Sequence, residues 1–350
     1  MLPEEWPIRP PAERGSFAPA TSAGSDRLST ARRDFFLPPA QRLTEQERAL
    51  MTAMLHRLVE DVSVEIQSRL PREWLPANED HAGLIDRLSG SGLLDTDSLM
   101  ALLLRRADEE RIATAFNARP GSRAVSIIQP LVSGEDSQVA AAAMSVLIAR
   151  GRRRDRYGQP LVELDDLSPE AAALLVHAVA AALCERKPLH VSNSDEEEAV
   201  CNAANALLER HDPAKSLDRL TAELVRLLDE GGLLDDGLAR LVIDNADMGV
   251  LRHLLARRAA IDPANAAAEL FSGESRRIML LLRLARVSRE VAGHLFALLG
   301  DLLGLGADLH ALAIFDSFTE ERLAIARSWL GLDLNFKHAL KALGHGHGTL

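Results

Sequence analysis

The sequence predicts an all-α protein made of two tandem copies of one multi-helix unit, arranged as a HEAT-like array of helical hairpins or a compact α–α bundle. Apolar residues recur at spacings of three and four, without sustained alternation of apolar and polar residues. Aromatic residues make up only 4% of the 350 residues, so the core must consist mainly of Leu, Ala, Val and Ile. Similar segments also recur at a constant offset of 139 residues.

Residues 1–42 are predicted to be a disordered, proline-rich arm. They hold seven of the 16 prolines and show no apolar periodicity, and proline disfavours helix. Two interpretations of their aromatic residues remain open. The pair Phe35 and Phe36 docks on the first helix, or the arm carries a short linear motif for a partner.

The first helix is expected to begin after Thr44, which forms a capping box with Glu47, and to end before Pro71. An apolar stripe runs along it from Leu50 to Ile66. Further helix starts are predicted where a capping side chain precedes a proline or an acidic residue. These starts lie at Ser168, Ser194 and Asp262.

The repeat is clearest between residues 92–108 and 232–247, which match with one deletion. At the offset of 139, Leu102 corresponds to Leu241 and Ile112 to Leu251. The matched positions are apolar or turn-forming, which indicates that the duplication preserves packing rather than chemistry. We therefore expect Leu102 and Leu241 to face equivalent cores.

Four segments follow from this pattern. The arm precedes a first helical unit at 43–185, with an inserted loop at 151–166. A second helical unit spans 190–330, and a C-terminal helix with a His/Gly tail spans 331–350.

Two stretches resemble an uncharacterised, mostly alphaproteobacterial family catalogued only as a domain of unknown function. They are LTEQERALMTAMLHRLVEDVSVEIQSRL, and FSGESRRIMLLLRLARVSREVAGHLFALL followed by ALAIFDSFTEERLAIARSWL. The resemblance covers roughly residues 43–330 and rests on apolar pattern and turns. It implies an all-helical fold and carries over no catalytic residues.

Composition excludes several classes of partner. The net charge of −11 argues against nucleic acid and anionic membranes, which require a basic face. The longest nearly uncharged run, 171–184, is too short to span a bilayer and predicts a buried helix. Two cysteines and an N-terminus without signal-peptide features predict a cytoplasmic location.

His56 is the candidate for phosphotransfer, because a helical histidine followed by acidic residues can accept a phosphoryl group. The alternative is a histidine paired with Glu60 one turn away. In the tail, His345 and His347 lie among glycines that leave them unorganised as ligands, so no metal or other cofactor is predicted.

The loop at 151–166 and the turn before it hold the only dense basic patch. Its members are Arg150, Arg152, Arg153, Arg154 and Arg156, beside the single tyrosine, Tyr157. This patch is either a solvated loop between units or a set of arginine forks that binds an acidic or phosphorylated partner.

Common nucleotide-binding, zinc-protease and hydrolase motifs are absent, and no catalytic residue is predicted. The sequence therefore favours a non-enzymatic protein-interaction or regulatory module in bacterial signalling. Its partners are expected to be other proteins, and its oligomeric state stays open. The alternative is a histidine phosphotransfer protein, or an enzyme with an unrecognised site.

Overall fold

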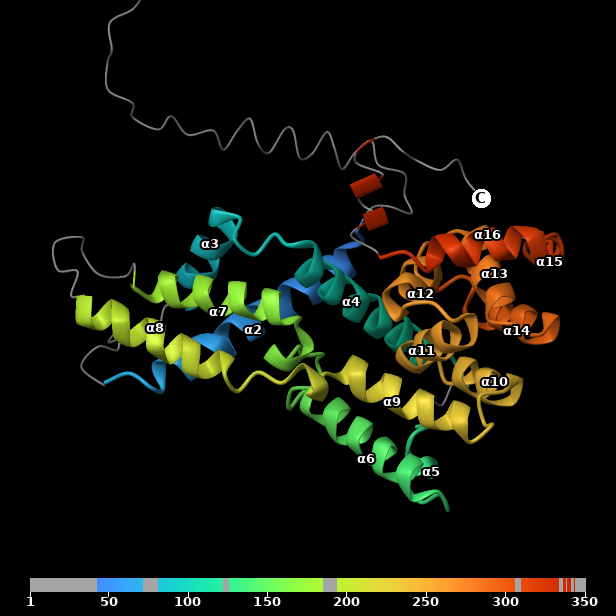
Figure 1. Ribbon diagram of the computed structural model, residues 1–350, viewed down its shortest axis with the longest axis horizontal. Coiled ribbons are helices and arrows are strands. Elements are labelled where there is room, and N and C mark those ends of the chain that lie inside the picture. The colour runs from blue at the N-terminus through green and yellow to red at the C-terminus, as the bar shows by residue number, and fades with distance from the viewer. Residues whose placement is uncertain are drawn as a thin grey trace, which may run out of the picture. The chain divides into compact units, whose positions relative to one another are not determined.

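The computed structural model describes residues 43–71, 81–121, 126–184, 194–305 and 310–333, with a few further residues up to 343 (Figure 1). The described residues are all-helical, with one isolated bridge between Arg154 and Pro160 in place of any strand. The α-helices are α2 (Glu45–Gln67), α3 (His81–Ser91), α4 (Asp97–Asn117), α5 (Gln129–Val132), α6 (Ser137–Arg152), α7 (Pro169–Cys184), α8 (Ser194–Leu208), α9 (Leu217–Glu230), α10 (Asp236–Asp244), α11 (Met248–Ala259), α12 (Pro263–Leu270), α13 (Ser275–Leu284), α14 (Arg289–Leu299), α15 (Ala311–Asp316) and α16 (Glu320–Leu330). Two 3-10 turns, η3 (Leu164–Asp166) and η4 (Pro213–Lys215), precede α7 and α9.

Several predicted segments lie outside the described residues. They are the arm at 1–42, with Phe35 and Phe36, and the tail at 344–350, with His345 and His347. Of the predicted C-terminal segment at 331–350, the described residues are 331–333, 336–337, 339–340 and 343, and only 336–337 and 339–340 are helical.

The predicted helix starts are confirmed where the caps are described. The Thr44 hydroxyl accepts from the Glu47 amide at 3.1 Å, and the Glu47 carboxylate accepts from the Thr44 amide at 2.7 Å. At α7 the Ser168 hydroxyl accepts from the Ala171 amide at 3.2 Å. Asp262 caps α12, whose first residue is proline. Local side-chain chemistry thus sets these starts.

The apolar helix predicted at 171–184 corresponds to α7, which packs against α2, α3 and α8. Most of its alanines and valines are buried, whereas Leu174 and His177 are exposed. None of the described helices is long and apolar enough to cross a membrane.

The buried apolar residues form two clusters. The first combines α2, α3, the N-terminal half of α4, α7 and α8. The second combines the C-terminal end of α4, α5, α6 and the helices from α9 onward. Because α4 has 21 residues, it contributes Leu102 to the first cluster and Ile112 to the second.

This division differs from the predicted units at 43–185 and 190–330. Helix α6 belongs by sequence to the first unit, yet its buried face packs on α9 in the second cluster. Helix α8 belongs to the second unit, yet it packs on α7 and α2 in the first cluster. The buried faces of both helices pack against helices of the other predicted unit. The two clusters therefore do not follow the predicted boundary between units.

The expected equivalence of residues 92–150 and 232–289 is not confirmed. Helix α4 is continuous, whereas the matching segment is broken into α10 and α11. The break falls at Ala246, which adopts a left-handed conformation with φ of 49°. The prediction that Leu102 and Leu241 face equivalent cores is wrong, because Leu102 is buried while Leu241 is 48% exposed.

Candidate functional site

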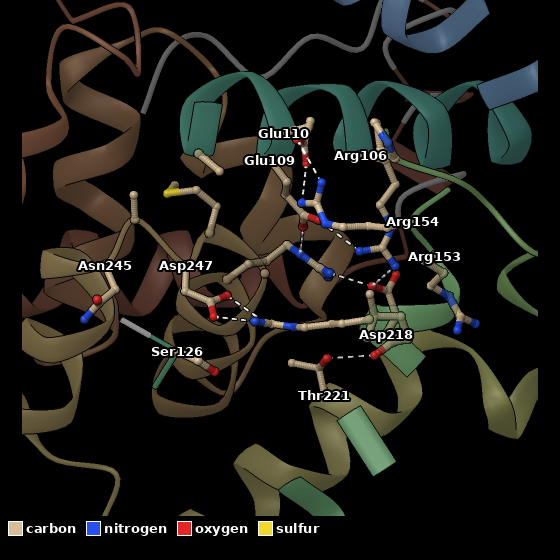
Figure 2. Close-up of a pocket in the computed structure, with 18 of the residues that line it drawn as sticks. Arg106, Glu109, Glu110, Ser126, Arg153, Arg154, Asp218, Thr221, Asn245 and Asp247 are labelled. Atoms are coloured by element: carbon tan, nitrogen blue, oxygen red, sulfur yellow. Dashed lines mark hydrogen bonds and ion pairs between the residues drawn. The ribbon is translucent and has the colours of Figure 1, made fainter. Parts of the chain in front are cut away.

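A polar pocket of about 270 Å³ lies where α4, α6, α9 and α11 meet (Figure 2). Charged side chains of both signs line it, among them Arg106, Glu109, Arg150, Asp218, Asp247 and Arg252. They come from segments more than a hundred residues apart in sequence. The pocket is therefore a product of the tertiary fold rather than of one motif.

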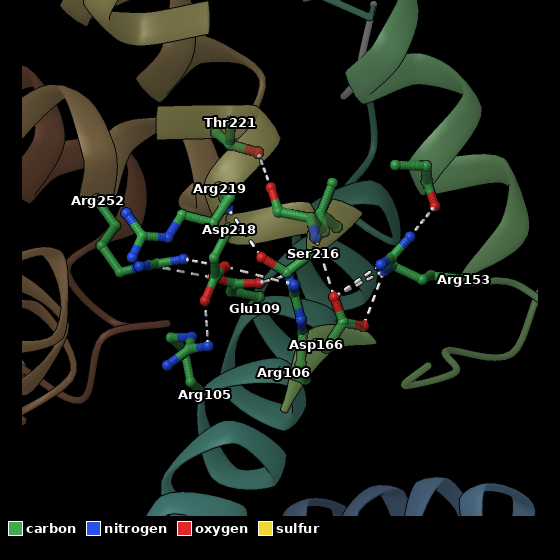
Figure 3. Close-up of polar contacts among 12 residues, drawn as sticks. Arg105, Arg106, Glu109, Arg153, Asp166, Ser216, Asp218, Arg219, Thr221 and Arg252 are labelled. Atoms are coloured by element: carbon green, nitrogen blue, oxygen red, sulfur yellow. Dashed lines mark hydrogen bonds and ion pairs between the residues drawn. The ribbon is translucent and has the colours of Figure 1, made fainter. Parts of the chain in front are cut away.

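Asp218 on α9 is the centre of the charge network (Figure 3). Its Oδ1 accepts from Arg252 Nη2 at 2.7 Å and lies 3.4 Å from Arg106 Nη2. Its Oδ2 accepts from Arg105 Nη2. Arg106 also donates to Glu109 at 3.0 Å, so two carboxylates share these guanidinium groups.

Burial alone would raise the pKa of the Asp218 carboxyl. The guanidinium groups of Arg105, Arg252 and Arg106 outweigh burial and hold that pKa well below its usual range. Asp218 is therefore an anion at neutral pH and is a poor general base. Burial lowers the pKa of the nearby His253 imidazole, which favours its neutral form.

Arg150 joins α6 to the start of α11. Its two terminal nitrogens bind the Asp247 carboxylate at 2.7 and 2.8 Å. Asp247 is the N-cap of α11 and accepts from the Val250 amide at 3.1 Å. This bidentate pair and the Asp218 network indicate that ion pairs at the pocket hold four helices together.

Most of the predicted basic patch is engaged inside the chain. Arg153 is buried and binds Asp166 through Nε and Nη2 at 2.8 to 3.0 Å. Arg154 binds Glu110 at 2.7 and 3.1 Å. Arg150 and Arg153, two of the five arginines predicted to bind a partner, are therefore fixed in the fold by their carboxylate partners.

Arg152 and Arg156 remain at the surface. Arg152 binds Glu163 through Nε at 3.1 Å and its side chain is still largely exposed. The Arg156 guanidinium lies over the Tyr157 ring, 4.7 Å from its centroid. Tyr157 is itself 72% exposed.

The outer face of α6 precedes these residues in sequence and is also exposed. Met144 is 42% exposed and Ile148 is 57% exposed, and Leu147 is also exposed. The opposite face packs on α9 through Val139, Ala143, Val146 and Ala149. We call Met144, Leu147, Ile148, Arg152, Arg156 and Tyr157 the α6 surface.

His56 is exposed on α2, away from the polar pocket. The two carboxylates that follow it, Glu60 and Asp61, both bind Arg57, at 3.1 and 2.9 Å. The expected pairing of His56 with Glu60 is therefore replaced by a pairing of Glu60 with Arg57.

Sequence reasoning missed Asp218 and Arg252 as members of a site. The available signal was the presence of charges within apolar helical stripes. Arg106 and Glu109 lie between Leu102 and Ile112 in the core-facing register of α4, and the buried Arg252 interrupts an apolar run of α11. Charges at such positions must be paired when buried.

Among the described residues, no group of three or more His, Cys, Asp or Glu side chains is arranged to hold a metal ion. Comparison of the chain with protein-family models, with curated proteins and with solved structures found no match.

Proposed function

We propose that this chain is a non-enzymatic protein-interaction module that binds its partner through the α6 surface. The observation that carries the proposal is the exposed apolar row of Met144, Leu147 and Ile148 on α6, which is followed in sequence by the exposed Tyr157 and two exposed arginines. Methionine, tyrosine and arginine are enriched at the centres of protein interfaces. Contiguous exposed apolar residues with a polar rim are typical of interaction sites.

The charge of this surface favours an acidic partner. Arg152 and Arg156 are exposed members of the predicted basic patch, beside Arg154, which is exposed and bound to Glu110. Arginine binds carboxylates and phosphates through paired donors. The proposal includes the predicted setting of bacterial signalling in the cytoplasm, and the proposed kinship with the uncharacterised alphaproteobacterial family.

A photo-reactive amino acid placed at Ile148 tests this proposal in the cells that make the protein. We expect cross-linked protein products from position 148. The matched control is position 325 on α16, where Ile325 is 51% exposed, and we expect few products there. Equal yields from the two positions would contradict the proposal.

The arginines are tested by replacing Arg152 and Arg156 with serine. Arg153 is left intact, because its removal would leave the buried Asp166 carboxylate unpaired. We expect unchanged folding and weaker binding of the cross-linked partner. The loss should be larger at low salt, where exposed charges are less screened.

Histidine phosphotransfer is the second candidate, favoured by the exposure of the His56 ring on α2. The test is to incubate the parent chain and the His56→Ala variant with a radiolabelled phosphodonor and to measure the label bound to each. Label that is taken up by the parent chain and lost in the variant would establish phosphotransfer. It would also contradict the non-enzymatic proposal.

A further inference from the structure

Between Val139 and Ala149, helix α6 is uncharged on every side, and the described residues cover only one of its sides. Residues 139–149 contain no charged side chain. A helix of this composition is normally buried all round. In Figure 1, α6 lies at the lower edge of the view with α9 beside it, and α5 is its other neighbour with many contacts. From this composition we expect a second packing partner on the outer face of α6.

The outer face also has the spacing of a helix-pairing seam. Ser137, Ala141, Met144, Ile148 and Gly151 are all exposed and follow one another at intervals of four, three, four and three residues. This is the repeat that places residues along one side of a two-helix coiled coil. The small residues among them allow two helix axes to approach to about 8 Å.

The two ends of α6 carry opposite charges. Glu135 and Asp136 are exposed at the N-terminal end, and Arg152 and Arg156 are exposed at the C-terminal end. Two such helices packed antiparallel bring unlike charges together at both ends. A parallel pair would bring like charges together and align the helix dipoles unfavourably.

We propose that the partner on the α6 surface is a second copy of this chain, with the two α6 helices packed antiparallel across a twofold axis. This inference rests on the proposed function and names its partner. The axis passes between Met144 and Ser145, so that Ile148 faces Ala141 of the partner copy. Each helix contributes a seam about 24 Å long, the length of 16 residues. Self-complementary patches of this kind form twofold dimers.

Sedimentation equilibrium of the full chain tests the dimer. We expect the mass of two chains for the parent protein and of one chain for Ile148→Asp, because two carboxylates would be placed in an apolar seam. The control Ile325→Asp, with a similarly exposed isoleucine on α16, should remain dimeric. Circular dichroism melting establishes that both variants fold.

Exchange of charged residues tests whether the opposite charges at the two ends of α6 pair between copies. Glu135→Arg alone places an arginine close to Arg152 and Arg154 of the other copy and should weaken the dimer at least several-fold. The double variant Glu135→Arg with Arg152→Glu should recover the affinity, because the pairing is restored with reversed sign. Equal affinities for the single and the double variant would contradict the antiparallel register.

A short bismaleimide linker tests orientation in a chain whose two cysteines, Cys184 and Cys201, are replaced by alanine. Ser145→Cys lies at the axis and should cross-link to itself. Gln138→Cys should cross-link to Gly151→Cys in a mixture of the two variants, and not to itself. Cross-linking of Gln138→Cys to itself would show a parallel pair and overturn the proposal.

The outcomes separate this inference from the proposed function. A chain that stays monomeric while position 148 still cross-links to a different protein overturns the second copy as partner and leaves the interaction module standing. A monomeric chain without cross-linked products from position 148 overturns both.

Discussion

At the scale of single residues, Asp218 compensates the positive charges that meet at the junction of α4, α9 and α11. Three guanidinium groups converge on this carboxylate, and those of Arg252 and Arg105 are largely shielded from water. A buried ion pair adds little net stability when complete, but removal of one partner leaves a buried charge without compensation. The complete network therefore contributes little net stability, but the loss of one member lowers the free energy of unfolding.

We expect Asp218→Asn to lower the free energy of unfolding by about 3–5 kcal/mol, because three arginines lose their shared counter-charge. The control on the same helix is Glu223→Gln, which breaks an exposed pair with Arg226 and should cost less than about 1 kcal/mol. Urea denaturation of both variants measures the difference. Equal losses would show that the network carries no special weight.

Asp108 introduces a pH dependence. Burial and the neighbouring Glu47 carboxylate raise the pKa of the Asp108 carboxyl from 3.8 to about 7, against the opposing effect of Arg111. Arg111 binds Glu47 at 2.8 Å and reaches Asp108 at only 3.5 Å. The single arginine thus compensates Glu47 better than Asp108.

The folded chain consequently binds more protons at Asp108 than the unfolded chain between pH 4 and 7. The contribution of Asp108 to stability is fully present below the unfolded pKa and is lost as the pH rises to about 7. We expect Asp108→Asn to flatten the stability curve over this window and to be relatively more stable at its upper end. Thermal melts from pH 4.5 to 8 in one buffer series check this, and parallel curves for the two chains would contradict it.

At the scale of helices, the sequence predicted starts better than breaks. Helix starts could be predicted from Thr44, Ser168 and Asp262, because a capping side chain accepts hydrogen bonds from amides two or three residues away. Asp247 also caps α11 by this rule, although no helix start was predicted there. The left-handed conformation of Ala246 could not be predicted, because alanine favours helix and disfavours φ of 49°. On either side of the break, α10 packs on α14 and α11 packs on α9.

This break separates Leu102 from its counterpart. We expect Leu102→Ala to destabilise the protein by about 2–5 kcal/mol, as for a buried leucine. Leu241→Ala should cost less than about 0.5 kcal/mol, as for a surface substitution. Chemical denaturation of both variants measures the costs, and a large cost at Leu241 would restore the equivalence of the two segments.

At the scale of the whole chain, the sequence predicted the all-helical class and missed the site. Periodicity is local and survives any arrangement of helices. Which helix covers which face depends on contacts between distant segments, such as Arg150 with Asp247 and Arg106 with Asp218. The basic patch was recognised as a cluster in sequence, but Arg153 is buried and Arg154 is bound to Glu110, whereas Arg152 and Arg156 are exposed.

The central claim also concerns the whole molecule: we propose that the outer face of α6 is covered by protein in the cell. Hydroxyl-radical footprinting inside the cells that make the protein tests it through two methionines of similar exposure, Met144 at 42% and Met100 on α4 at 36%. Relative to the dilute purified chain, oxidation of Met144 should fall several-fold in cells while oxidation of Met100 changes little. Oxidation of both methionines in the same proportion in cells and in dilute solution would contradict the account.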